Sequence, residues 1–88
     1  MNNTRFLFSN LGTDVMRCVA AAKRHDDKRY NDSLFRAYKT LTYLRRAHRP
    51  EAYEEGLLLI RALEYARSGK TLDAFSVHLN RHISSLAA

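Results

Sequence analysis

One stretch of the chain carries basic and aromatic residues at alternating intervals of three and four. On an α-helix this spacing puts every side chain on one side, over roughly 25 Å at ~1.5 Å per residue. Cations on such a strip can contact successive phosphates, and a tyrosine can stack on an unpaired base. The spacing therefore predicts a site for a nucleic-acid backbone, with RNA favoured over duplex DNA. The residues of this basic strip are Arg29, Asp32, Arg36, Lys39, Tyr43 and Arg46.

The distribution of charge points to the same stretch. The chain has a net charge of +6, and residues 23–49 alone contain nine Lys or Arg against three Asp. Concentrated charge creates a local field that attracts polyanions. We add Arg45 and Arg49 to the predicted nucleic-acid-binding residues, because they extend the cluster to Pro50. Two other interpretations stay open, a solvated basic face with no ligand and a surface for acidic proteins.

Helix ends explain part of this pattern without any ligand. Arg45 and Arg46 fall in a last helical turn and Glu51 in a first turn, where each charge opposes the helix dipole. Pro50 favours the first position of a new helix. One or two cations would suffice for the dipole, so the excess of arginine still needs another explanation.

The histidines form a weaker candidate for metal binding. His78 and His82 are four residues apart on one helical face, and an up-down arrangement brings His48 to the same end. Three imidazoles can hold zinc or nickel, but no Cys or acid is evidently close. We therefore expect no metal and no cofactor. The single cysteine, Cys18, excludes a disulfide within the chain and lies on an apolar stripe, which predicts a buried, unreactive thiol.

No arrangement of residues indicates catalysis. The chain has no Gly-rich phosphate loop and no Ser, His and Asp pattern that can be placed together. Asp14 and Arg17, three residues apart, indicate only a surface pair. We expect a protein that is not an enzyme, and the lack of secretory or membrane-spanning apolar runs favours the cytoplasm.

Apolar residues recur every three or four positions and predict an all-α fold. The predicted helices cover about 4–24, 27–48, 50–68 and 72–86, with an Asp as N-cap after His25 and Gly69 as the C′ residue just past the end of the third helix. The short connections favour an up-down antiparallel four-helix bundle in a single domain, 1–88.

The third predicted helix is apolar on nearly all sides at its middle. Leu57, Leu58, Leu59 and Ile60 are consecutive, and Leu63 follows one turn later. Such a helix is typical of the centre of a bundle or of a contact between subunits. We expect Leu57, Ile60 and Leu63 in the core, this helix to be the most buried, and a homodimer through it. A protein-interaction or homo-oligomeric module is therefore the alternative function.

Overall fold

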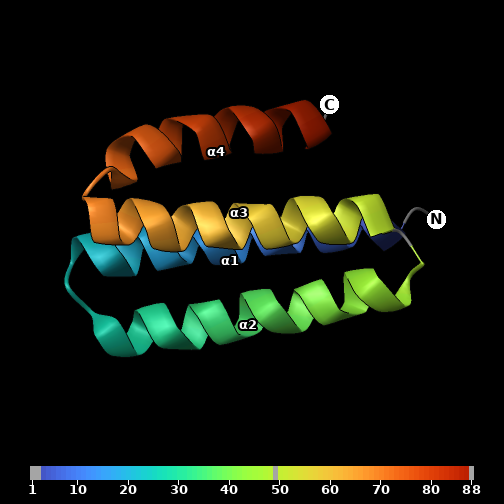
Figure 1. The fold of residues 1–88 in the computed structure, drawn as a ribbon, viewed down its shortest axis with the longest axis horizontal. Coiled ribbons are helices and arrows are strands. Elements are labelled where there is room, and N and C mark those ends of the chain that lie inside the picture. Colours follow the sequence, from blue (N-terminus) through green and yellow to red (C-terminus); the bar gives the residue numbers. More distant parts are fainter. Residues whose placement is uncertain (1–2, 49, 88) are drawn as a thin grey trace.

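The computed structural model describes residues 3–48 and 50–87, and the side chains of 5–48 and 50–81. It contains four helices: α1 (Asn3–Lys23), α2 (Asp27–Arg46), α3 (Pro50–Gly69) and α4 (Leu72–Ala87). Successive helices run antiparallel, as Figure 1 shows. The predicted all-α, up-down bundle is confirmed, with helix ends within two residues of those expected. No helix in the described part of the chain combines the length and apolar character needed to span a membrane.

The most buried helix is α1, and not α3 as the sequence predicts. Both α1 and α3 contact each of the other three helices, whereas α2 and α4 make no contact within the described residues. These two helices lie on opposite sides of the α1–α3 pair, which gives a flattened bundle of 37 × 24 × 17 Å (Figure 1). The apolar run of α3 misled the prediction because Leu58 is 61% exposed, while α1 buries a broad face.

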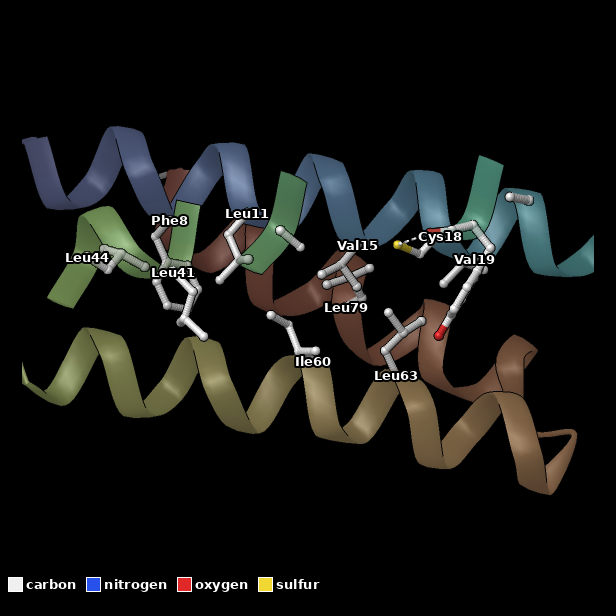
Figure 2. Packing of buried hydrophobic residues seen from close by; sticks show 13 residues of the cluster. Phe8, Leu11, Val15, Cys18, Val19, Leu41, Leu44, Ile60, Leu63 and Leu79 are labelled. Carbon is white, nitrogen blue, oxygen red and sulfur yellow. Dashed lines mark hydrogen bonds between the residues drawn. The ribbon is translucent and has the colours of Figure 1, made fainter. Parts of the chain in front are cut away.

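The core lies between α1, α2 and α3 and is closed by α4. Its fully enclosed side chains come from every helix, with Ile60 and Leu63 of α3 buried as predicted and Leu57 partly buried. The apolar stripe on which the sequence places Cys18 is buried in α1, as predicted. Figure 2 shows these side chains pointing toward one another: Phe8, Leu11, Val15, Cys18 and Val19 of α1, Leu41 and Leu44 of α2, and Leu79 of α4.

Gly56 allows α3 to pack close to its neighbours. A Cβ atom at this position would lie 2.8 Å from Leu11 Cδ2 and 2.8 Å from Leu41 Cδ1. Carbon atoms in contact prefer about 3.5–4.0 Å, so a larger residue cannot be added without movement. The glycine therefore sets how closely the middle of α3 approaches α1 and α2.

Each turn between helices contains a residue other than glycine in the left-handed region. These residues are His25 (φ 56°), His48 (φ 56°) and Lys70 (φ 59°). After α3, the Thr71 N–H donates to the Ala66 carbonyl at 2.9 Å, which is the hydrogen bond of a Schellman motif. The left-handed position after α3 is thus Lys70, and the prediction of Gly69 is wrong by one residue.

The predicted Asp N-cap after His25 is Asp26. Its carboxylate accepts a hydrogen bond from the Arg29 backbone N–H at 3.1 Å. This bond satisfies one of the N–H groups that lack a partner in the first turn of a helix. The cap fixes where α2 begins and therefore the register of the basic strip on it.

Candidate nucleic-acid interface

Two adjoining hollows run along the seam between α1 and α2. Arg17 of α1 and Arg36 of α2 line both, so they stand at the junction. We call this surface the α1–α2 groove. The first hollow, of about 380 Å³, is also lined by Ala20, Ala21, Arg24, Asp26, Arg29, Asp32 and Ser33. The second, of about 350 Å³, is also lined by Asn10, Thr13, Asp14, Lys39, Thr40 and Tyr43.

Most of the basic strip borders this groove. Arg29, Asp32, Arg36, Lys39 and Tyr43 line it, and Arg46 is exposed one turn beyond Tyr43. Tyr43 is 45% exposed, which leaves one part of its ring accessible for stacking. The structure therefore brings together the residues that the spacing of three and four predicts on one side of α2.

Three cations of the strip form no ion pair among the described residues. Among the described residues, no carboxylate lies within ion-pair distance (4.0 Å) of Arg36, Lys39 or Arg46. The acids at the start of α3, the most obvious neutralising groups, do not reach them: Glu51, Glu54 and Glu55. Unpaired, exposed cations are those that can exchange their counterions for phosphates.

The other cations of the groove are partly neutralised. Arg29 Nε lies 3.5 Å from Asp26 Oδ2, and Arg17 Nη1 lies 3.6 Å from Asp14 Oδ1. Asp14 is only 7% exposed, so the predicted surface pair with Arg17 is in fact half buried. Burial raises the pKa of Asp14, and the nearby Arg17 and Arg36 oppose that rise. A carboxylate thus lies between two arginines on the floor of the groove.

Helix α1 contributes groove residues that the sequence interpretation missed. Arg17 lies on α1 and Arg24 in the turn directly after it, seven residues apart, and both line the same seam. With Asp14 and Ala21 they form a second row at intervals of three and four, the same signal that identified the strip on α2. That row could have been noticed, but which helix it faces depends on the tertiary packing.

Two predicted residues do not join the groove. Arg45 is exposed, but it follows buried Leu44 while Tyr43 precedes it, so Arg45 and Tyr43 lie on opposite flanks of α2. Arg49 lies outside the described residues. The position of Arg45 therefore does not support its prediction as a nucleic-acid-binding residue, although its side chain is exposed.

The predicted histidine cluster is not assembled by the packing of the helices. His48 lies in the turn after α2 and His78 is exposed on α4, and α2 and α4 do not contact each other in the described part of the chain. The side chain of His82 lies outside the described residues. Within those residues, no three His, Cys, Asp or Glu side chains are arranged to hold a metal ion.

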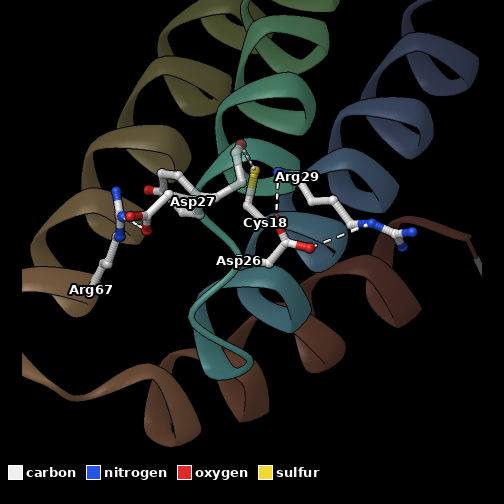
Figure 3. A network of polar contacts seen from close by, with 6 residues as sticks. Cys18, Asp26, Asp27, Arg29 and Arg67 are labelled. Carbon is white, nitrogen blue, oxygen red and sulfur yellow. Dashed lines mark hydrogen bonds and ion pairs between the residues drawn. The ribbon is translucent and has the colours of Figure 1, made fainter.

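A separate polar cluster ties α3 to the start of α2 (Figure 3). Arg67 Nη2 donates to Asp27 Oδ1 at 3.0 Å, and its guanidinium lies 3.8 Å from the centroid of the Tyr30 ring. Cation–π contacts of this kind stabilise by about 0.5–2 kcal/mol. Burial raises the Tyr30 pKa, which Arg67 opposes. Cys18 Sγ donates to the Tyr30 carbonyl at 3.7 Å and is fully buried, as predicted.

The comparisons with known proteins do not place the chain in a family. No protein-family model matches it, and no curated protein or solved structure matches it either. Any functional argument therefore depends on the geometry of the groove and on the chemistry of its side chains.

Proposed function

We propose that this chain is a small, cytoplasmic, non-enzymatic protein that binds RNA along the α1–α2 groove. The observation that carries the proposal is the row of unpaired, exposed cations Arg36, Lys39 and Arg46 beside Tyr43. Arg17 of α1 and Arg24 of the turn after α1 extend the positive surface beyond α2. Phosphates on this surface would release counterions, which is the main source of affinity in sequence-independent binding.

The shape of the groove favours a single strand over a duplex. Its cations lie along a hollow seam between two helices, whereas a duplex major groove is read by an element that projects into it. A single strand can follow a seam and present an unstacked base to Tyr43. The ligand class that fits these features is single-stranded RNA, bound through its backbone with little sequence preference.

The test is a salt titration of binding to a short, fluorescently labelled single-stranded RNA. A triple variant, Arg36→Gln, Lys39→Gln and Arg46→Gln, removes three phosphate contacts without weakening the helix, since Gln is a good helix former. Each lost contact flattens the plot of log affinity against log salt by about 0.7, so we expect a reduction of roughly 2 in slope. Tyr43→Ala should weaken binding by about 1–3 kcal/mol with little change in slope.

A matched control removes the same charge elsewhere. Arg61, Lys70 and Arg81 are exposed and do not line the groove. Replacing all three by Gln lowers the net charge equally, but should leave the slope nearly unchanged. Equal effects of the two triple variants, or no binding by the parent at low salt, would refute the groove as a specific site.

We propose self-association as a second property, through the exposed side of α3. Leu58 and Tyr65 are 61% and 82% exposed and lie seven residues apart, on one side of this helix. Large apolar side chains exposed on one face are typical of a contact with another protein. Neither Leu58 nor Tyr65 lines the α1–α2 groove.

A further inference from the structure

Exposed aromatic and apolar side chains occur on both helices of the α2–α3 pair. On α2, Phe35 is 69% and Tyr38 41% exposed, and on α3 they are matched by Leu58 and Tyr65. The Tyr38 hydroxyl donates to Glu64 Oε1 at 3.4 Å across the seam between the helices. Tyr38 and Glu64 therefore lie at the same level along the pair.

Helical geometry turns the most exposed of these side chains to the same outer face. On α2, the Phe35 side chain points about 60° further from the direction of buried Ala37 than the Tyr38 side chain does. On α3, the Tyr65 side chain points about 100° further from the direction of buried Ile60 than the Glu64 side chain does. Leu58 shares the side of Tyr65. The outer α2–α3 face is thus an apolar surface two helices wide.

The two helices of this face carry opposite charge. Among their residues, α2 has six cations and two acids, whereas α3 has four acids and two cations. A partner that places a basic helix on α3 and an acidic helix on α2 would complement both. The charged residues are Asp27, Lys28, Arg29, Asp32, Arg36, Lys39, Arg45 and Arg46 of α2, and Glu51, Glu54, Glu55, Arg61, Glu64 and Arg67 of α3.

We propose that the partner is a second copy of this chain, related by a twofold axis parallel to the helices, an inference that rests on the self-association proposed above. This axis places α2 of one copy against α3 of the other. Because α2 and α3 are antiparallel (Figure 1), the facing helices are also antiparallel, which aligns their dipoles favourably. An axis perpendicular to the helices would instead place basic α2 on basic α2.

Two specific contacts follow, because the hydrogen bond between Tyr38 and Glu64 fixes which residues of α2 and α3 lie at the same height along the helix axes. To within one helical turn, Phe35 faces Tyr65 of the second copy, and Arg46 faces Glu54 of the second copy. The twofold repeats each contact, so four aromatic rings meet near the axis. Two helices of about 30 Å offer roughly 600 Å² per copy, slightly less than the ~800 Å² of a standard interface. We therefore expect a dimer with a dissociation constant in the micromolar range.

The test is sedimentation equilibrium of the full chain, without RNA, at concentrations from about 1 to 200 µM, a range that spans micromolar dissociation constants. Phe35→Ser and Tyr65→Ser, which keep the helices and the charges, should each weaken the dimer at least ~10-fold. Arg46→Glu and Glu54→Arg should each weaken it at low salt, and the double reversal should restore it. Arg81→Glu on α4, off this face, is the control and should have no effect.

The outcomes separate this arrangement from the more general proposal. A parent that stays monomeric throughout would overturn both self-association and the twofold dimer. A dimer insensitive to Phe35→Ser, or one that the double charge reversal fails to restore, would overturn only this geometry. Phe35 lies outside the α1–α2 groove, so the Phe35→Ser variant should bind RNA as tightly as the parent at low protein concentration.

Discussion

Replacing Gly56 by alanine tests the close approach of α3 to α1 and α2. The added Cβ would lie 2.8 Å from methyl groups of Leu11 and Leu41, two side chains that are 0% and 3% exposed. Each methyl group must therefore retreat by about 1 Å to reach an ordinary contact distance. In a packed core such displacements cost about 1–3 kcal/mol.

The helix itself gains from the same substitution. Alanine is better than glycine in a helix interior by about 1 kcal/mol, so the net destabilisation of Gly56→Ala should be about 1 kcal/mol. Urea unfolding followed by circular dichroism measures this loss directly. With a slope of about 1 kcal/mol per molar urea for a chain of this size, the midpoint should fall by about 1 M.

Gly69→Ala is the matched control, because it makes the same change near the end of the same helix. A Cβ at Gly69 meets only Thr71 Oγ1, at 3.9 Å, and the backbone has no positive φ. This variant should be stabilised by a few tenths of a kcal/mol up to about 1 kcal/mol. A Gly56→Ala protein as stable as Gly69→Ala would refute the packing argument. In a Leu41→Ala background, which removes one displaced methyl group, Gly56→Ala should destabilise the protein less than it destabilises the parent.

Two predictions concern the titrating groups near the groove. Asp14→Asn removes the acid between Arg17 and Arg36, so single-stranded RNA should bind several-fold more tightly with a salt slope steeper by about 0.7. The gain in affinity should shrink as pH falls through the raised pKa of Asp14, because this carboxyl group then becomes neutral in the parent as well. Fluorescence anisotropy of the labelled RNA at several pH values checks this. Weaker binding by the variant than by the parent would contradict it. Burial, with a smaller contribution from Asp14, raises the pKa of Cys18 to about 12. The folded state therefore holds this proton more tightly than the unfolded chain, and stability should decline as pH rises from the ordinary thiol pKa toward 12. At pH 8 a thiol reagent should react with Cys18 roughly a thousandfold faster after unfolding, and similar rates in both states would refute its burial.

The sequence predicts the helices well because their periodicity depends on each segment alone. The stripe of Phe8, Leu11 and Val15 on α1 is such a case, and so is the basic strip on α2. The choice of the most buried helix is different, since an apolar run shows how many sides can be buried and not how many are. Leu58 illustrates this, because it belongs to the apolar run of α3 and is nevertheless 61% exposed.

Positions that depend on neighbouring elements are the ones that the sequence could not predict. Glycine is the usual residue at the left-handed end of a helix, yet Lys70 occupies that position because the Thr71 to Ala66 hydrogen bond sets the register. Likewise, Arg17 becomes a groove residue only because its flank of α1 lies beside α2, and Arg24 because the turn after α1 lies at the end of the same seam. The sequence around Asp14 shows no pattern that distinguishes a buried carboxylate from a surface one.

The order of the helices along the chain has a consequence for how the bundle folds. α1 precedes the other three helices, and its most extensive packing is with α2, the next in order. Contacts between elements that are close along the chain require little loop closure and favour rapid folding. The α1–α2 hairpin can therefore form while later residues are still being translated, α3 can dock on a surface that already exists, and α4 adds last. In this order the basic groove is the first surface of the molecule to be completed.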